Sequence, residues 1–455
     1  MKHTSSHWKR IGWFGIAAMG TAAAVELSCG GVPPSVVVDE ATNQDVILIV
    51  IDTLRGDAAE RARTPELDWL ANNGGHSIHA WAPGTWTAPS TLSLMTGSHL
   101  RDHGWDLPFP DKLEPGQVYP SLDDRKTLAE VMKEAGYTTM GLYANPLLSR
   151  ELGWQRGFDS WKRTSDVKMP RKLRNQLKKI DPEAPLFAYL HYLGPHQPLY
   201  PSRRSGDYWG VDWDLLGRYR KGLRRKFIKN GSQHEKDQYY RAYHAQVEDA
   251  DRRLGWIWPE LGERFEDALI IVTSDHGEML GEHGVFGHGS HVWDPVTRVP
   301  LVVHGSKLTL PSPMSTTGVA DLITRSVGID YAWPETIHSA WPLVSQREGK
   351  LAVSGDGFVR GVWRRPDRTK LDVYDLATDP NETTPVNGLA ERAATRMIRH
   401  LWQAGHVGRQ IDPEEGEMDD ETKRLLEELG YMGVDDEVLP PGEVAAPPVD
   451  DINDH

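Results

Sequence analysis

The sequence predicts an α/β fold, an α/β/α sandwich with a mostly parallel central sheet plus a small C-terminal α+β subdomain. Several apolar runs, such as 45–52 and 268–275, are continuous rather than alternating, which is typical of strands buried on both faces. Helical patterns separate these runs, and alternating strands and helices build a sandwich of this kind. Several runs end in an acid or precede a histidine, at the sheet edge where such folds place their functional site.

Composition limits the classes of function. The chain has 455 residues, enough for one large domain and a smaller one, with 39% hydrophobic and 25% charged residues. Its 51 Lys and Arg against 65 Asp and Glu give a net charge of -14, which argues against a nucleic-acid partner. A single cysteine excludes a disulfide scaffold and a cysteine-based zinc site, so imidazoles and carboxylates are the available metal ligands.

The N-terminus predicts export. Lys2, Lys9 and Arg10 precede the apolar run Ile11–Val25, which has the length of a signal-peptide core and is short for a transmembrane helix. Cys29 follows at once, in a setting that resembles a bacterial lipoprotein processing site. We therefore predict a signal peptide over residues 1–29, with lipidation at Cys29 or plain cleavage nearby, and a bacterial periplasmic or outer-membrane-anchored protein. Residues 30–43 predict a linker.

The main domain is predicted over residues 44–340. Its strands are expected at Asp45–Asp52, Tyr137–Tyr143, Leu186–Leu193, Ala268–Asp275 and Pro300–His304. Its helices are expected from the N-cap Thr64 and Pro65 to Gly74–Gly75, and at Lys126–Ala135 and Gln238–Trp258. In this arrangement Asp52, His196 and Asp275 converge beyond the strand ends.

A change of pattern near residue 345 predicts the small subdomain over residues 345–432. Phe358–Arg364 and Leu371–Leu376 predict a hairpin, and Ala390–Gln403 and Asp420–Leu429 predict helices. Residues 433–455 are acidic and partly rich in proline, which predicts a disordered tail.

Polar residues follow the apolar run that ends at Asp275. The stretch from Ser274 to His291 alternates acids and histidines with glycines, which favours a metal or oxyanion site over an ordinary loop. The spacing differs from His-Glu-x-x-His, so a helix-borne zinc protease site is not supported. Asp52 taken alone could simply cap the following turn.

A hydroxyl-rich segment precedes another expected helix. Pro89 suits the first helical position, which would place Thr87 just ahead of a helix N-terminus that favours negative charge. Such a hydroxyl can attack phosphorus or sulfur if its pKa is lowered. Taken alone, the segment is better interpreted as an ordinary N-cap rich in Ser and Thr.

Together these segments resemble the sulfatase family of the alkaline-phosphatase-like superfamily, from about Asp45 to Tyr431. Five motifs occur in the family's order: VIDTLRGD around Asp52, TWTAPSTLSLMTG with Thr87 at the catalytic position, the Pro-His-x-Pro segment at His196, TSDHGEMLGEHGVFGHG from Thr273, and VYDL from Val373. The resemblance implies the alkaline-phosphatase/sulfatase-like fold and ester hydrolysis.

Several positions depart from the family pattern, among them Thr53, which replaces the second Asp typical of calcium-binding sulfatases. Thr87 stands where true sulfatases convert Cys or Ser to formylglycine, and Thr91 replaces the signature arginine. Asn145 stands where a lysine is usual, and His276 replaces the Asn or Gln of calcium-binding members. This set resembles relatives that use an unmodified threonine to transfer or hydrolyse phosphoryl groups with one zinc or manganese ion.

The implied reaction is displacement on a phosphate or sulfate ester. Asp52, Thr87, Asp275 and His276 would bind one divalent ion, with Zn or Mn favoured over Ca, and Thr87 would form a covalent intermediate. His196 and His288 would assist catalysis, and His191, Asn145 and Thr91 would contact the substrate. We expect an anionic ester substrate (glycan, lipid or small molecule) and no nucleic acid; a hydrolase and a phosphoryl transferase both fit.

Two rival readings stay open. One is a catalytically degenerate protein that binds an anionic glycan or lipid. The other is a true sulfatase that has replaced formylglycine.

Overall fold

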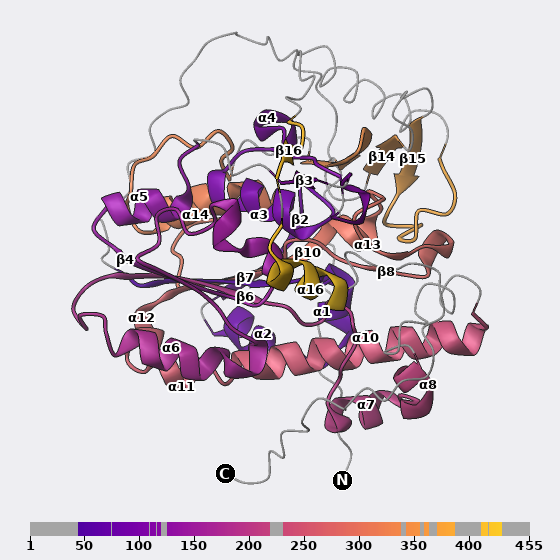
Figure 1. The fold of residues 1–455 in the computed structure, drawn as a ribbon, viewed down its shortest axis with the longest axis horizontal. Coiled ribbons are helices and arrows are strands. Elements are labelled where there is room, and N and C mark those ends of the chain that lie inside the picture. Colours follow the sequence, from indigo (N-terminus) through magenta and orange to yellow (C-terminus); the bar gives the residue numbers. More distant parts are fainter. Residues whose placement is uncertain are drawn as a thin grey trace, which may run out of the picture.

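An eight-stranded mixed sheet forms the centre of the molecule (Figure 1). The computed structural model describes residues 44–429 apart from 74, 109, 115, 120–124, 219–230, 338–342, 355–358, 364–370, 387–410 and 417. The strands, in spatial order, are β11 (Met314–Ser315), β2 (Gly75–Trp81), β10 (Arg298–His304), β7 (Leu269–Thr273), β1 (Val46–Ile51), β6 (Leu186–Tyr192), β4 (Thr138–Tyr143) and β5 (Ser160–Arg163). The five strands from β7 to β5 are parallel, which confirms the predicted fold class.

Strand β10 is the exception, because it runs antiparallel to both of its neighbours, β2 and β7. Strands β2 and β5 were not among the predicted strands. The sequence of β2, GHSIHAW, has two exposed histidines, and that of β5, SWKR, is short and basic. Both therefore lack the continuous apolar character by which the buried strands were recognised.

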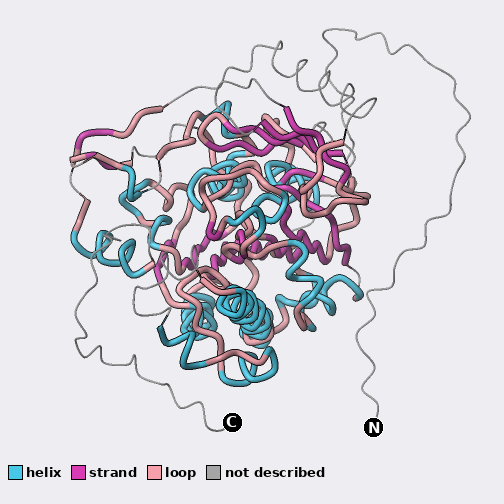
Figure 2. Tube along the Cα trace, turned by 90° about the vertical axis from the view of Figure 1, so that its right-hand side faces the viewer, coloured by secondary structure: helices cyan, strands magenta, loops and turns pink. Residues whose placement is uncertain are grey.

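Helices cover both faces of the sheet (Figures 1 and 2). One face packs against α3 (Thr87–Thr96), α5 (Leu128–Glu134) and α14 (Val319–Ser326). The other packs against α1 (Gly56–Arg61), α2 (Pro65–Asn72), α6 (Met169–Leu177), α10 (Gln233–Leu254), α11 (Trp258–Leu261) and α12 (Arg264–Asp267). Alternate residues of β1 enter the two cores, because successive side chains of a strand point to opposite faces.

Shorter elements connect these layers. The helices are α4 (Leu100–His103), α7 (Arg203–Trp209), α8 (Trp213–Arg218) and α13 (Asp294–Thr297). The strands are β3 (Gln117–Val118), β8 (Met279–Leu280), β9 (Phe286–Gly287) and β16 (Glu414–Glu415). Single 3₁₀ turns occupy Pro110–Lys112, Pro146–Leu148, Arg150–Leu152, Asp166–Lys168, Glu282–Gly284 and Thr316–Gly318. Among the described residues, no helix combines the length and apolar character needed to span a bilayer.

The C-terminal part contains a four-stranded antiparallel sheet of β12 (Leu343–Arg347), β13 (Lys350–Ser354), β14 (Val359–Trp363) and β15 (Leu371–Asp375). The expected hairpin corresponds to β14 and β15, and the structure adds β12 and β13. The helix α16 (Asp420–Glu428) matches the expected one within a residue. The predictions on residues 1–43, with Cys29, on the helix 390–403 and on the tail 433–455 lie outside the described residues.

The start of α10 and the capping of α2 differ from expectation. Helix α10 begins five residues early, at Gln233, because Ser232 and Glu235 form a capping box. The Thr64 hydroxyl does not cap α2 and donates instead to the Ala59 carbonyl at 3.0 Å. The free N–H groups of α2 donate to Asp251 of α10, at 3.0 and 3.1 Å, so a residue distant in sequence supplies the cap.

Candidate active site

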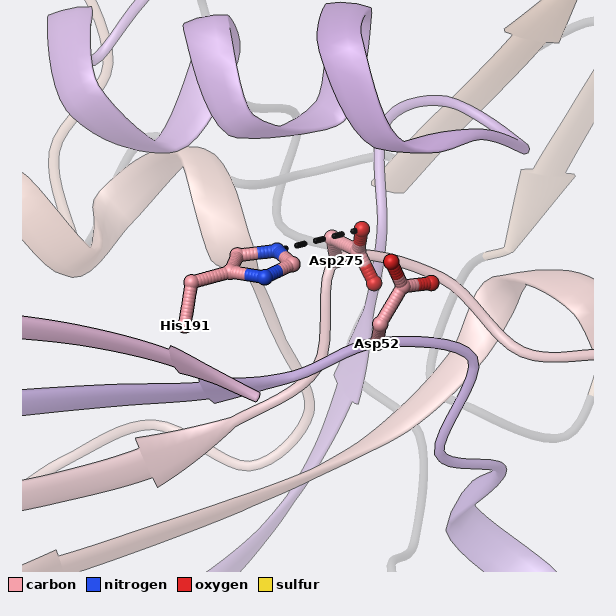
Figure 3. Close-up of side chains that lie close together, drawn as sticks. All are labelled: Asp52, His191 and Asp275. Atoms are coloured by element: carbon pink, nitrogen blue, oxygen red, sulfur yellow. Dashed lines mark ion pairs between the residues drawn. The ribbon is translucent and has the colours of Figure 1, made fainter. Parts of the chain in front are cut away.

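Asp52, His191 and Asp275 meet where three neighbouring strands end (Figure 3). Asp52 directly follows β1, His191 lies near the end of β6, and Asp275 lies just beyond β7. One ligand atom from each of the three lies within 4.8 Å of the others, and His191 Nε2 is 3.7 Å from Asp275 Oδ2. All three side chains are buried. Of the three residues predicted to converge, Asp52 and Asp275 meet, and the imidazole beside them is His191, which projects from a strand, rather than His196.

His276 brings a second imidazole to the same carboxylates. Its Nε2 lies 3.7 Å from Asp52 Oδ1 and 3.6 Å from Asp275 Oδ2. Its Nδ1 lies 2.9 Å from the Gly277 carbonyl, so Nδ1 carries the proton and donates it there. The Nε2 lone pair is then free to bind a cation, the arrangement common for histidine ligands.

Thr87 completes what we call the strand-end site: Asp52, Thr87, His191, Asp275 and His276. The Thr87 hydroxyl is 3.4 Å from Asp52 Oδ2 and 3.5 Å from His276 Nε2. Asn145 Nδ2 donates to both Asp52 Oδ2, at 2.7 Å, and Thr87 Oγ1, at 3.1 Å. A neutral amide thus fixes the hydroxyl beside the carboxylate.

The position of Thr87 in its helix differs from the prediction. Thr87 is the first residue of α3 rather than the residue ahead of it, and Pro89 is the third. The reason is that the N–H groups of the first helical turn have no partner within the helix, so proline is tolerated there as well as at the first position. The predicted proximity of Thr87 to a helix N-terminus still holds.

The chemistry of the donors fits a divalent cation. Asp52 Oδ1 and Asp275 Oδ2 are buried and accept no hydrogen bond from the described residues, and neither ring nitrogen of His191 makes one. Burial and the nearby Asp275 carboxylate hold the pKa of Asp52 well above its usual range, and burial lowers the pKa of His276 to about 4. Buried carboxylates with unsatisfied oxygens are costly unless a cation compensates them.

Two further histidines border the site. The His288 ring lies 4.5 Å from that of His276 and 5.0 Å from that of His196, measured between centroids. His288 Nδ1 is 3.2 Å from Glu278 Oε2, and both side chains are buried. Sequence reasoning did not select Glu278, although it lies three residues after Asp275 in the same acidic run. A second acid so near the first was the signal that could have identified it.

The sulfatase family model matches residues 44–327. The chain belongs to the sulfatase family.

Three similar proteins illustrate the range of this sulfatase relationship. The low-salt glycan biosynthesis sulfotransferase Agl7 of Haloferax volcanii is 28% identical over 308 residues, which cover 64% of this chain and 60% of that relative. The phosphonate monoester hydrolase of Agrobacterium radiobacter shares the fold with a TM-score of 0.61 at 17% identity, over 82% of this chain and 100% of that one. Ps i-CgsB, solved with k-i-k-neocarrahexaose, gives 0.61 at 17% identity, over 84% and 97%.

The departures of this sulfatase-family chain have definite places in the structure. Thr91 lies one turn after Thr87 on α3, is buried, and its hydroxyl makes no hydrogen bond within the described part of the chain. Asn145 was predicted to contact substrate, but its amide bonds to Asp52 and Thr87. His191, also predicted as a substrate residue, lies among the candidate metal ligands instead.

Proposed function

We propose that the chain is a metal-dependent hydrolase of phosphate or sulfate esters in which an unmodified Thr87 is the nucleophile. The observation that carries this proposal is the setting of the Thr87 hydroxyl, within 3.5 Å of Asp52, Asn145 and His276 at the buried end of the central strands. The sulfatase-family match supports ester chemistry at this position.

Asp52, Asp275 and His276 would hold one divalent ion, with His191 available as a fourth protein ligand. When bound, the ion supplies Lewis-acid stabilisation of negative charge and lowers the pKa of a neighbouring hydroxyl. Imidazole ligands suit zinc or manganese better than calcium, which prefers oxygen ligands alone. We therefore propose zinc or manganese as the native metal.

Each of the neighbouring protein groups has its own role in the displacement. Asn145 orients the Thr87 oxygen, which attacks phosphorus and forms a P–O bond as the hydroxyl proton passes to Asp52 Oδ2, its acceptor at 3.4 Å, and the bond to the leaving oxygen breaks. His288 or His196 protonates that leaving oxygen. His288 Nδ1–H donates a hydrogen bond to Glu278 Oε2 at 3.2 Å, which fixes the ring so that Nε2 faces away from the carboxylate. Water, or an acceptor alcohol in a transferase, then attacks the phosphothreonine and releases Thr87.

The positive charge available for substrate is limited. The described buried side chains include no lysine, and the three buried arginines Arg55, Arg347 and Arg360 are each paired with carboxylates. The histidines and the metal would thus supply the positive charge that binds the anionic ester. Agl7 is a sulfotransferase of glycan biosynthesis, and Ps i-CgsB was solved with the oligosaccharide k-i-k-neocarrahexaose. Both similarities support an anionic glycan ester as the substrate, although a lipid or a small molecule fits the same chemistry. We propose phosphate esters over sulfate esters, since sulfothreonine lacks the release route that formylglycine provides.

The proposal is tested by measuring the turnover of Thr87 variants on a panel of aryl phosphate, phosphonate and sulfate esters. Thr87→Ala should remove nearly all turnover, because the hydroxyl that forms the covalent intermediate is lost. Thr87→Ser should retain substantial turnover. Mass spectrometry of enzyme quenched during turnover should find phosphate on the peptide that contains Thr87.

Ser93→Ala is the matched control. Ser93 lies on the same helix, is buried, and its hydroxyl is 2.9 Å from a histidine nitrogen, that of His103. The control should keep wild-type turnover. Full activity in Thr87→Ala would overturn the nucleophile and leave activated water in its place.

A binding protein without turnover is the second candidate function. Its basis is Thr91, which stands in place of the signature arginine with an unsatisfied buried hydroxyl. Wild-type protein with stoichiometric metal that binds a sulfated or phosphorylated oligosaccharide in calorimetry but hydrolyses no ester would favour it.

We also propose export as a lipoprotein that begins at Cys29, from the N-terminal basic and apolar segments. A fatty-acid analogue should label the wild type and not Cys29→Ala. Equal labelling of both would contradict lipidation at this residue.

A further inference from the structure

Strand β12 of the small C-terminal sheet contacts the segment that leads into α3. Ser345 Oγ donates to the Ala82 carbonyl at 2.7 Å, and the Gln346 N–H donates to the Pro83 carbonyl at 2.8 Å. This segment ends at Trp86, the residue before Thr87. The small sheet therefore holds the chain directly ahead of the proposed nucleophile.

Arg347, the last residue of β12, reaches from that segment to the loop that carries His288. Its side chain is fully buried, and Nε donates to the Gly289 carbonyl at 2.6 Å. Its guanidinium carbon lies 5.5 Å from the centre of the Trp86 ring. One side chain thus touches the residue before Thr87 and the residue after His288. The two segments also meet directly, because the Gly289 N–H donates to the Thr85 carbonyl at 2.8 Å.

The guanidinium is fixed at every nitrogen. Nη1 donates to Asp106 Oδ1 at 3.0 Å and to the Leu107 carbonyl at 2.7 Å, and Nη2 donates to Glu348 Oε1 at 2.8 Å. Two carboxylates balance its charge. A planar group held by four acceptors has one permitted orientation, and a lysine ammonium cannot reproduce that set of directions.

We propose that Arg347 is a positioning residue that sets the spacing between Thr87 and His288, and that the small sheet is thereby part of the active site. This inference rests on the proposed function. Displacements of about 1 Å between reacting groups can cost about 10²-fold in rate, so a residue that only holds two loops can act strongly.

Arg360 provides a matched control. It lies on β14 of the same sheet, is equally buried, and pairs with Glu382 at 2.9 Å. It donates to Thr297 Oγ1 at 2.7 Å and to the Val292 carbonyl, so its contacts lie beyond the His288 loop and away from Trp86. A purely structural role would make the two arginines equivalent.

The test compares Arg347→Lys with Arg360→Lys in the full, metal-loaded chain, on whichever aryl ester the wild type hydrolyses. We expect Arg347→Lys to lower kcat by about 10²-fold with KM within about threefold, and Arg360→Lys to lower kcat by less than about threefold. In a His288→Ala background, Arg347→Lys should have little further effect, because it acts through that residue. Equal losses in the two lysine variants, or full additivity with His288→Ala, would overturn the proposal.

Amide hydrogen exchange separates this inference from the proposed function. Arg347→Lys should accelerate exchange in peptides that cover 82–88 and 286–291, whereas Arg360→Lys should leave both unchanged. If the wild type hydrolyses no ester, the proposed function fails and the exchange data still decide the positioning role. Unchanged exchange in both peptides of Arg347→Lys would refute it.

Discussion

Two groups of buried carboxylates in this chain differ in how fully their oxygens are hydrogen-bonded. In the strand-end site, Asp52 Oδ1 and Asp275 Oδ2 accept no hydrogen bond from the residues that the structure describes, and each acid lies close to the other. In a second group, the Asp249 cluster, Asp249 Oδ1 accepts from Ser202 Oγ at 2.8 Å, Ser205 Oγ at 2.6 Å and Arg252 Nη2 at 2.5 Å. Both groups are buried. The satisfied group has the contacts expected of a structural cluster, whereas the unsatisfied oxygens of the strand-end site have the chemistry of cation ligands.

The largest expected effect is on stability, in the Asp249 cluster. Asp249→Ala leaves the hydroxyls of Ser202 and Ser205 without their carboxylate acceptor and removes the carboxylate partner of Arg252. We expect the free energy of unfolding to fall by about 2–3 kcal/mol, because the buried hydroxyls lose hydrogen bonds to a charged acceptor, whereas the partly exposed Arg252 can be solvated. Urea unfolding of the metal-free protein measures it. A loss below about 1 kcal/mol would contradict the expectation that the Asp249 cluster stabilises the fold.

Metal affinity is the next quantity. Asp275→Asn removes a charged ligand from the strand-end site, so the affinity for zinc should fall at least about 100-fold, the upper end of the effect of outer-shell partners. His276→Ala and His191→Ala should also weaken binding, whereas His196→Ala should not. Calorimetric titration of apo protein with zinc measures each value. Unchanged zinc affinity in Asp275→Asn would show that the unsatisfied carboxylate oxygens are not metal ligands.

His244 on α10 shows how burial affects a basic side chain. Its Nδ1 donates to the Tyr240 carbonyl at 2.9 Å, its Nε2 makes no hydrogen bond among the described residues, and the Trp209 ring lies 5.0 Å away. Burial, together with the charges of Arg55 and Arg61, lowers the pKa of His244 to about 4 and outweighs the Tyr240 carbonyl and Asp57, which raise it. The unfolded chain therefore binds the proton more readily than the folded one.

The direction in which stability changes with pH follows from that difference in proton binding. The stability contributed by neutral His244 is complete above pH 6.5 and is lost as the pH falls from 6.5 toward 4. The loss should reach about 2–3 kcal/mol. His244→Phe should reduce the difference in unfolding free energy between pH 7 and pH 4.5 by that amount. An unchanged difference would show that the imidazole is protonated in the folded protein.

The smallest expected effect has the opposite sign. Asp52→Asn removes one of two crowded buried charges while its amide oxygen can still accept from Asn145 Nδ2. We expect the metal-free protein to gain about 1 kcal/mol of stability, because a buried charge without a cation is unfavourable. Asp249→Asn should instead lose stability. Urea unfolding in the presence of a chelator compares the two, and destabilisation by both variants would contradict the distinction.

Much of the site could be predicted because it depends on local features. The continuous apolar run of β1 indicates a strand buried on both faces, and Asp52 directly follows it. Asp275 has the same place after β7. Parallel neighbours end at one edge of a sheet, so the pattern alone brings these two acids together.

The tertiary structure decided the contacts that depend on register and on distant segments. His191 lies inside β6, and only the pairing of β6 with β1 places its ring beside the carboxylates. Asp251 caps α2 from more than 180 residues away, and Arg347 reaches Gly289 across 58 residues. Sequence periodicity reports which face of an element is buried, because that depends on the local backbone geometry. It carries no information about which distant donor meets which acceptor, since that depends on how whole elements pack.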